Sequence, residues 1–135
     1  MPTCIITLRL SRDSDLSTSI ESQRAACQAY ADARGWDVLL VTEDLDVSGA
    51  TKLEDRPGMA RALEALPDAD YMLAAKLDRY ARSVLEFSRL LKYADDAGTT
   101  LVTADGTLSP ETSRLVVHVL SAFAEYERDM ITTRI

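Results

Sequence analysis

Four short apolar segments alternate along the chain with four segments of helical periodicity, and this alternation limits the fold more than any other feature. The apolar segments predict β-strands and cover 3–10, 36–42, 70–75 and 99–104. Apolar residues recur every three or four positions in the other segments, which predict helices over 20–34, 59–66, 83–97 and about 110–135. Strands that alternate with helices predict an α/β fold with a mostly parallel central sheet flanked by helices.

Residues with capping and helix-ending preferences mark the ends of the predicted helices. Thr18 and Glu21 have the spacing of a capping box, and Gly35 stands where the first helix should end. Ser109 before Pro110 predicts the start of the last helix. That helix reaches Ile135 without a stop signal and carries a wide apolar stripe. It therefore either packs on the sheet or contacts a second subunit through a long interface helix.

Composition places the chain among single, soluble domains. It has 135 residues, of which 47% are hydrophobic, and it contains no apolar run long enough to span a membrane. Cys4 and Cys27 lie in apolar surroundings without CxxC spacing, which is typical of reduced core residues in a cytosolic protein. The net charge of -7 argues against a free-standing nucleic-acid-binding domain.

Charged and hydroxyl residues follow three of the predicted strands. In a parallel sheet, ligands bind outside the carboxyl ends of the strands. The first strand ends with Arg9-Leu10 and is followed by Ser11. The second leads into a polar stretch over 43–55, and Lys76 follows the third. We therefore expect one edge of the sheet to bring together Ser11 and four arginines, namely Arg9, Arg56, Arg79 and Arg82.

A serine among arginines suits phosphoryl-transfer chemistry. Guanidinium groups stabilise negative charge that develops on phosphate oxygens, and a serine hydroxyl can attack phosphorus to form a covalent phosphoserine. Arginine is a poor base because it stays protonated. Asp78 is therefore a candidate proton donor or acceptor, and its alternative role is to orient an arginine. For Asp44 and Asp46, the alternative to a role at this site is a structural role as turn residues or helix caps. The sequence shows no metal-ligand cluster, so we expect neither a metal ion nor a cofactor.

These residues resemble the catalytic domain of serine recombinases, the resolvase and invertase group, and most closely the large serine integrases of phages. The resemblance covers essentially the whole chain, as one catalytic domain over 1–135. Its motifs occur in order as Arg9-Leu10-Ser11, Ser22-Gln23, Asp46-Val47-Ser48-Gly49, Arg56-Pro57-Gly58, Lys76-Leu77-Asp78-Arg79 with Arg82-Ser83, and Leu120-Ser121-Ala122-Phe123-Ala124-Glu125 with Glu127-Arg128.

The resemblance implies a role for each matching residue. Ser11 would be the nucleophile, and the four arginines would surround the scissile phosphate. The remaining implied site residues are Gln23, Lys76 and Asp78 as assisting groups, Asp44 or Asp46 as an active-site acid, and Arg128 and Arg134 on the interface helix. Two positions depart from the pattern, because many members have Tyr where this chain has Thr7 and Leu where it has Tyr80.

The resemblance also implies a reaction and its partners. Four subunits would cleave two double-stranded DNA attachment sites through 5′-phosphoserine links, exchange the ends by rotation and rejoin them without a nucleotide cofactor. The subunits would form homodimers and homotetramers through the C-terminal helix, in the cytoplasm of a bacterial host and with no membrane partner. An accessory directionality factor would be a further partner. Family members carry a C-terminal DNA-binding part, which we expect to be absent from this acidic chain.

Three other interpretations compete with a phage integrase. A resolvase or invertase, or a serine transposase, would use the same catalytic domain, and the sequence after Ile135 would separate these classes. A receiver-like phospho-binding module would share the alternation of strands and helices. That module needs an acidic pair after the first strand, where this chain has Arg9-Leu10-Ser11.

Overall fold

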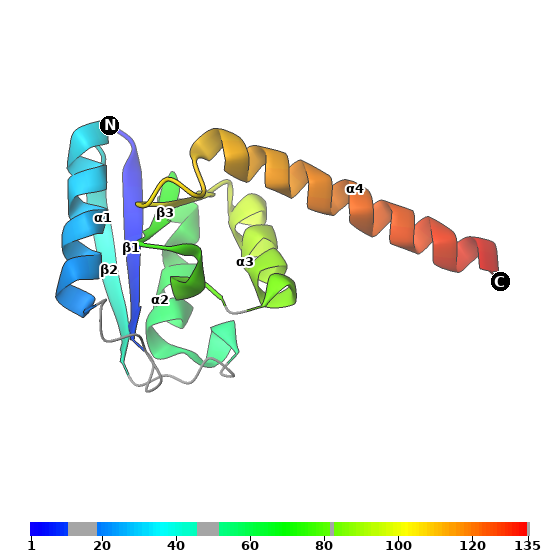
Figure 1. The fold of residues 1–135 in the computed structure, drawn as a ribbon, viewed down its shortest axis with the longest axis horizontal. Coiled ribbons are helices and arrows are strands. Elements are labelled where there is room, and N and C mark those ends of the chain that lie inside the picture. Colours follow the sequence, from blue (N-terminus) through cyan, green and yellow to red (C-terminus); the bar gives the residue numbers. More distant parts are fainter. Residues whose placement is uncertain (11–18, 46–51, 82, 135) are drawn as a thin grey trace.

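The computed structural model describes residues 1–10, 19–45, 52–81 and 83–134 of the chain (Figure 1). The strands are β1 (Thr3–Leu10), β2 (Asp37–Leu45), β3 (Tyr71–Ala74) and β4 (Thr100–Thr103). The helices are α1 (Ile20–Arg34), α2 (Pro57–Ala65), α3 (Val84–Ala97) and α4 (Pro110–Arg134). Short 3₁₀ turns cover Leu53–Asp55, Leu66–Asp68 and Leu77–Arg79. The elements alternate as the sequence predicts.

The four described strands form one parallel sheet in the order β2-β1-β3-β4. The predicted α/β fold is therefore confirmed. The chain passes from β1 through α1 to β2 on one side, and α2 then returns it to β3 on the other side of β1. The strand order thus reverses between β1 and β3. In open parallel sheets, such a switch point leaves a crevice at the carboxyl ends of the two strands, where ligands bind.

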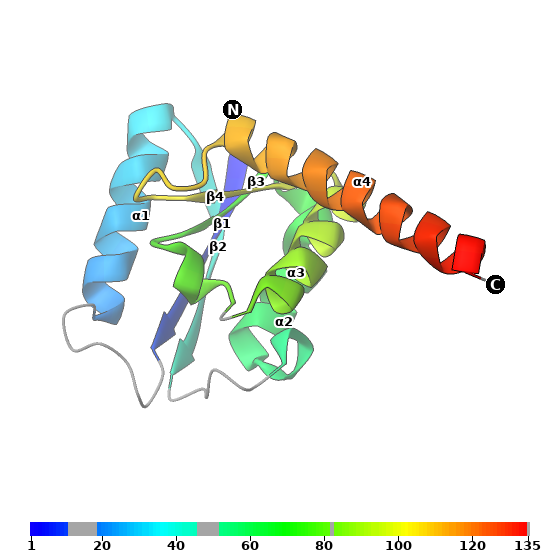
Figure 2. The same cartoon turned by 45° about the vertical axis from the view of Figure 1, so that its right-hand side comes forward.

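Helices cover both faces of the sheet (Figure 2). Successive side chains of a strand point to opposite faces. Ile6 of β1 packs in one core cluster with Cys27 of α1, and Ile5 packs in the other with Met59 of α2 and Leu90 of α3. Cys27 is a free, buried thiol, as is Cys4, which confirms their prediction as core residues. Burial raises the pKa of Cys4 to about 11 and that of Cys27 to about 12.

Several predicted boundaries differ from the structure by one or two residues, and the largest difference is at the end of the second strand. The second strand continues past Thr42 to Leu45, because Asp44 and Leu45 stay in register with Arg9 and Leu10 of β1. Pairing with β1 therefore extends β2 into the polar stretch that was predicted to be a loop.

The cap of α1 was also predicted one residue too early. The cap is Ser19, whose hydroxyl accepts a hydrogen bond from the Ser22 backbone N–H at 3.0 Å, so it replaces the expected Thr18–Glu21 box. The cap of α4 agrees with the prediction, since the Ser109 hydroxyl accepts from the Thr112 N–H at 3.2 Å.

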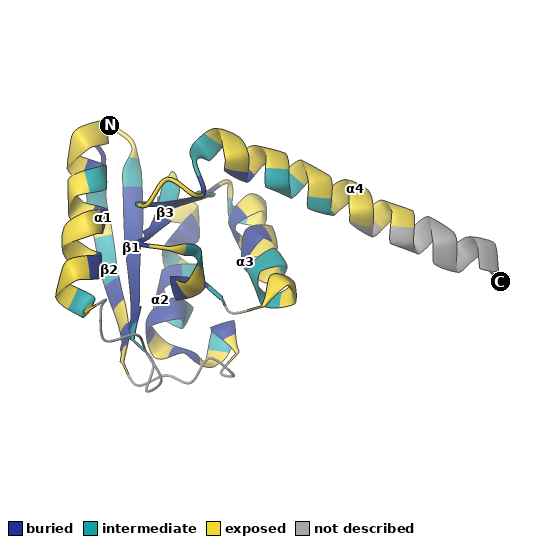
Figure 3. Cartoon of the chain, in the orientation of Figure 1, coloured by how far each residue is buried: buried dark blue, intermediate teal, exposed yellow. Residues whose placement is uncertain are grey.

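The first half of α4 packs on the domain, and the helix then projects away from the sheet (Figures 1 and 3). Ser113 is buried, and Val116, Val117 and Leu120 lie against the α2–α3 side of the core. A row of larger apolar side chains on the same helix stays between 58% and 61% exposed and consists of Leu115, Val119, Phe123 and Tyr126. No helix in the described part of the chain is both long and apolar enough to cross a membrane.

Candidate active site

Three buried arginines meet at the switch point between β1 and β3. Arg9 comes from the end of β1, Arg56 from the residue before α2, and Arg79 from the 3₁₀ turn after β3. Their exposed fractions are 3%, 3% and 5%. Arginine is almost never buried without partners, so three such residues together require an explanation. The predicted convergence of arginines at one edge of the sheet is confirmed for these three.

Backbone carbonyl groups of the β3–α3 connection accept hydrogen bonds from two of the arginines. The Nη2 of Arg9 donates to the carbonyl of Asp78 at 2.6 Å. The Nη1 and Nη2 of Arg56 donate to the carbonyls of Tyr80 and Arg79 at 2.8 and 3.3 Å. Arg79 donates from its own Nη1 to the carbonyl of Arg9 at 3.4 Å. Backbone carbonyl groups thus hold the three guanidinium groups in place. The carboxylates of Asp44 and Asp78 lie beside two of them and oppose part of the positive charge.

Asp44 joins the arginine cluster to the start of α2. One of its carboxylate oxygens lies 3.5 Å from the Nε of Arg56. The two oxygens also accept the backbone N–H groups of Gly58 and Met59 at 2.7 and 3.0 Å, as a negative group at a helix N-terminus does. Burial lowers the pKa of Arg56, and the Asp44 carboxylate opposes that change.

Gln23 holds the end of β1 from the first turn of α1. Its side-chain amide donates to the carbonyl of Arg9 at 2.9 Å, and its amide oxygen accepts the Arg9 N–H at 3.3 Å. Because this bidentate contact is buried, it fixes the main chain at Arg9, two residues before Ser11 in the sequence.

The two other charged residues predicted after β3 lie at the surface. Asp78 has a side chain that is 63% exposed and lies 3.4 Å from the Nε of Arg79. Lys76 is exposed as well. Asp78 is therefore placed to orient Arg79, which is one of the two roles that the sequence left open for it.

Five further predicted site residues cannot be placed. Ser11, Asp46 and Arg82 lie outside the described residues, and so do the side chains of Arg128 and Arg134 on α4. The described residues contain no group of three His, Cys, Asp or Glu side chains that could hold a metal ion.

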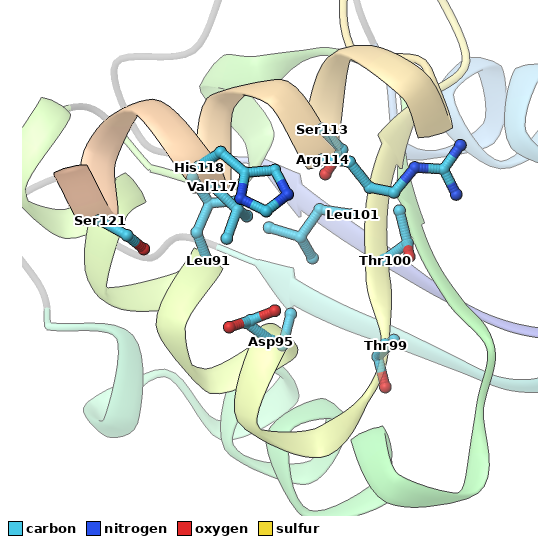
Figure 4. Close-up of a pocket in the computed structure, with 11 residues that line it drawn as sticks. Leu91, Asp95, Thr99, Thr100, Leu101, Ser113, Arg114, Val117, His118 and Ser121 are labelled. Atoms are coloured by element: carbon cyan, nitrogen blue, oxygen red, sulfur yellow. The ribbon is translucent and has the colours of Figure 1, made fainter.

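A cavity of about 410 Å³ lies away from Arg9, Arg56 and Arg79, between α3, β4 and the beginning of α4 (Figure 4). His118 of α4 and Asp95 of α3 both line it, with Thr100 at the edge of the sheet. None of the arginine cluster lines this cavity. The buried cationic cluster at the switch point, and not this cavity, is the candidate active site.

Sequence reasoning missed one residue at the site. Tyr80 stood out only as a departure from a family pattern, yet its backbone carbonyl binds Arg56 and its side chain is fully buried. An aromatic residue directly after a charged Lys-Leu-Asp-Arg segment is the signal that could have found it.

Comparison with known proteins gives three consistent results. The family model described as "Resolvase, N terminal domain" matches residues 4–135. The Transposon Tn2501 resolvase of Escherichia coli is 28% identical over 126 residues, which are 91% of this chain and 63% of that protein. DNA-invertase hin of Salmonella typhimurium is 33% identical over 85 residues, which are 62% and 45% of the two chains. The chain thus spans only part of the length of these relatives.

A similar solved structure is the N-terminal catalytic domain of TP901-1 integrase. It matches with a TM-score of 0.74 and 33% identity, over 95% of this chain and 98% of that chain. Because the match covers nearly all of both chains, it concerns the whole domain and not one motif.

Proposed function

The chain belongs to the resolvase family and forms the catalytic domain of a serine recombinase, and from this membership we propose that it cleaves and rejoins DNA through Ser11. The observation that carries the proposal is the cluster of Arg9, Arg56 and Arg79 at the switch point of the sheet. Ser11 follows Leu10, the last residue of β1, and stands two positions after Arg9 in the sequence.

The proposed chemistry is an in-line exchange at phosphorus. The Ser11 Oγ forms a bond to phosphorus while the bond from phosphorus to the 3′-oxygen of DNA breaks. The proton that leaves the serine hydroxyl balances the proton that the 3′-oxygen takes up. Guanidinium groups stabilise the charge on the non-bridging oxygens. The phosphoserine keeps the energy of the phosphodiester, so attack by a 3′-hydroxyl reverses the step without a nucleotide cofactor.

We assign distinct roles to the residues around the serine. Arg9 and Arg79, with Arg82, contact the phosphate, and Arg56 is the fourth member of this set. Gln23 holds the main chain at Arg9, Asp78 orients Arg79, and Lys76 adds positive charge at the exposed side. Asp44 acts through Arg56 and the N-terminus of α2. Asp46 stays the other candidate for an active-site acid.

The proposed substrate is double-stranded DNA with attachment sites, and the active form is a homodimer that pairs into a homotetramer. The exposed apolar row of α4 supports self-association, and Arg128 and Arg134 would contribute from the same helix. Because the chain has a net charge of -7, we assign recognition of the attachment site to a DNA-binding part of the protein beyond this domain. The reaction would take place in the bacterial cytoplasm, where the DNA lies.

Within the family, we propose the phage integration type over resolution, inversion or transposition. The support is coverage at a given identity: the TP901-1 integrase domain matches along 95% of the chain at 33% identity, whereas the invertase hin matches along 62% at the same identity and the Tn2501 resolvase along 91% at 28%. An accessory directionality factor would then be a further partner.

A covalent adduct tests the proposed reaction directly. The protein is incubated in EDTA with DNA fragments from the genome that encodes it, stopped with detergent, and assayed for DNA that stays attached to protein. We expect adducts whose digestion gives a phosphorylated peptide containing Ser11, and sequencing of the attached DNA would identify the site.

Neighbouring serines provide matched controls. Ser11→Ala should form no adduct, whereas Ser14→Ala and Ser17→Ala in the same segment should retain it. Adduct formation by Ser11→Ala would move the nucleophile to another residue. A requirement for magnesium would contradict a reaction in which arginines alone carry the phosphate charge.

A further inference from the structure

Tyr80 directly follows Arg79, and its ring is buried between the sheet and α3. Its exposed fraction is 0%, and its ring centroid lies 6.4 Å from that of Phe87 in α3. The ring belongs to the core cluster that also contains Ile5 of β1 and Met59 of α2. The residue directly after the turn Leu77–Arg79 is thus anchored in the core, whereas Asp78 within the turn is exposed.

The hydroxyl of Tyr80 reaches two strands of the sheet. Its oxygen lies 2.8 Å from the carbonyl oxygen of Met72 in β3 and 2.7 Å from that of Val102 in β4. Burial raises the pKa of Tyr80 well above its ordinary value, so the hydroxyl keeps its proton and serves as a donor. The single hydroxyl proton is shared between the two carbonyl oxygens. This buried contact with β3 and β4 holds the main chain of Tyr80 in place over the sheet.

The main chain held in this way is the acceptor for the arginine cluster. The carbonyl of Tyr80 accepts from Arg56 at 2.8 Å, and the carbonyl of Asp78 accepts from Arg9 at 2.6 Å. Arg79 belongs to the turn itself. A shift of this turn would therefore move three guanidinium groups that come from three separate parts of the chain.

We propose that Tyr80 is a positioning residue for DNA cleavage, whose hydroxyl fixes the turn Leu77–Arg79 to β3 and β4 and thereby sets the geometry of Arg9, Arg56 and Arg79. The inference rests on the proposed recombinase function and adds to it a fully buried residue that acts through the arginines. Its effect is on the chemical step, because displacing groups that hold a reacting phosphate slows reaction more than binding.

Thr99 provides a matched control for a purely structural role. Its hydroxyl is also buried and also lies near two carbonyl oxygens, those of Leu66 at 2.6 Å and Ala69 at 3.0 Å. It precedes β4, at the amino end of the sheet, whereas the arginines lie at the carboxyl ends. Tyr80→Phe and Thr99→Val each remove one such hydroxyl and keep most of the side-chain volume. Both should lower Tm to a similar extent, by about 3–6 °C.

The first measurement uses the DNA-free chain. Proton–nitrogen spectra resolve the Nε–Hε groups of buried arginines, and Arg→Lys variants assign them. In Tyr80→Phe, we expect the signals of Arg56 and Arg79 to shift and to exchange faster with water, while Thr99→Val leaves them in place. This result does not depend on recombinase activity, so it separates the positioning role from the proposed function.

The second measurement is the rate of covalent adduct formation at saturating protein, together with DNA affinity. We expect Tyr80→Phe to slow adduct formation by about ten-fold to a hundred-fold with affinity within a few-fold of the parent. Thr99→Val should retain the parental rate.

Each contrary result has a distinct meaning. Unchanged arginine signals in Tyr80→Phe would overturn the positioning role, as would a parental cleavage rate despite altered signals. Equal slowing by Thr99→Val would assign the effect to lost stability. A parent protein that forms no adduct would overturn the proposed function, and the arginine signals would still show whether Tyr80 orders the cluster.

Discussion

At the scale of single residues, Arg79 has the contacts of a group that can bind phosphate. Its Nη1 donates to the Arg9 carbonyl at 3.4 Å, a long hydrogen bond, and its Nε faces the exposed carboxylate of Asp78. A planar guanidinium can hold two phosphate oxygens at once, whereas the ammonium group of lysine acts as a point charge. Substituting Arg79 by lysine keeps the positive charge and removes the planar geometry, so it separates the two contributions.

We expect Arg79→Lys to bind DNA within a few-fold of the parent and to cleave it about a hundred-fold more slowly, because one donor to a developing oxyanion is worth about that much. The measurement is adduct formation at saturating protein. Arg61→Lys on the exposed side of α2 is the control and should cleave at the parental rate. Cleavage by Arg79→Lys near the parental rate would mean that Arg79 contributes only general electrostatic attraction for DNA.

The pair of Asp44 and Arg56 allows a second prediction, for stability. Asp44→Asn leaves the Arg56 guanidinium, which is 3% exposed, without its carboxylate. Removing one partner of a buried ion pair costs about 3–5 kcal/mol, so we expect a loss of roughly this size in the free energy of unfolding in urea. Glu43→Gln is the control, because Glu43 pairs with Arg24 at 3.9 Å in an exposed position, where the loss should stay below about 1 kcal/mol. Similar losses in both variants would contradict a structural role for the buried pair.

At the scale of elements, α2 begins in close contact with β2, and glycine makes this contact possible. A Cβ atom at Gly58 would lie 2.7 Å from the Glu43 carbonyl oxygen and 2.9 Å from a carboxylate oxygen of Asp44. The Gly58 N–H also donates to that carboxylate. The start of the helix therefore cannot accept a side chain without moving away from the strand.

We expect Gly58→Ala to lower the free energy of unfolding by about 1–3 kcal/mol, as overpacking does, even though alanine favours helices. Urea unfolding measures the loss. Arg61→Ala, on the exposed side of the same helix, should change stability by less than about 0.5 kcal/mol. A gain in stability for Gly58→Ala would mean that helix propensity outweighs the contact between α2 and β2.

At the scale of the whole molecule, α4 leaves the domain with an apolar row exposed. Leu115, Val119, Phe123 and Tyr126 follow one another at spacings of three or four residues, so they lie along one side of the helix. An exposed apolar row of this length is typical of an interface between proteins.

We expect Phe123→Asp to lower self-association of the protein, measured by light scattering, while the unfolding of the domain stays unchanged. The reason is that Phe123 is 58% exposed and would place a charge in the proposed subunit interface. Thr112→Asp, which adds the same charge to an exposed site in the first turn of α4, is the control. Self-association that survives Phe123→Asp would place the interface outside this row.

The sequence by itself predicted the elements of the fold and most of the residues at the site. Strands and helices were readable because their apolar periods depend on neighbours a few positions away, as in 3–10 and 83–97. The arginines were found because Arg9 lies at the end of one strand and Arg79 follows another, and the carboxyl ends of parallel strands lie at one edge of the sheet.

Only the tertiary structure decided the features that depend on residues far apart in the chain. It set the strand order with its switch between β1 and β3, and it extended β2 through pairing with β1. It joined Asp44 to Arg56 and placed the Tyr80 hydroxyl between β3 and β4. No local sequence period predicts these contacts. Each depends on where a separate segment returns to the sheet, and packing of the whole core sets that position.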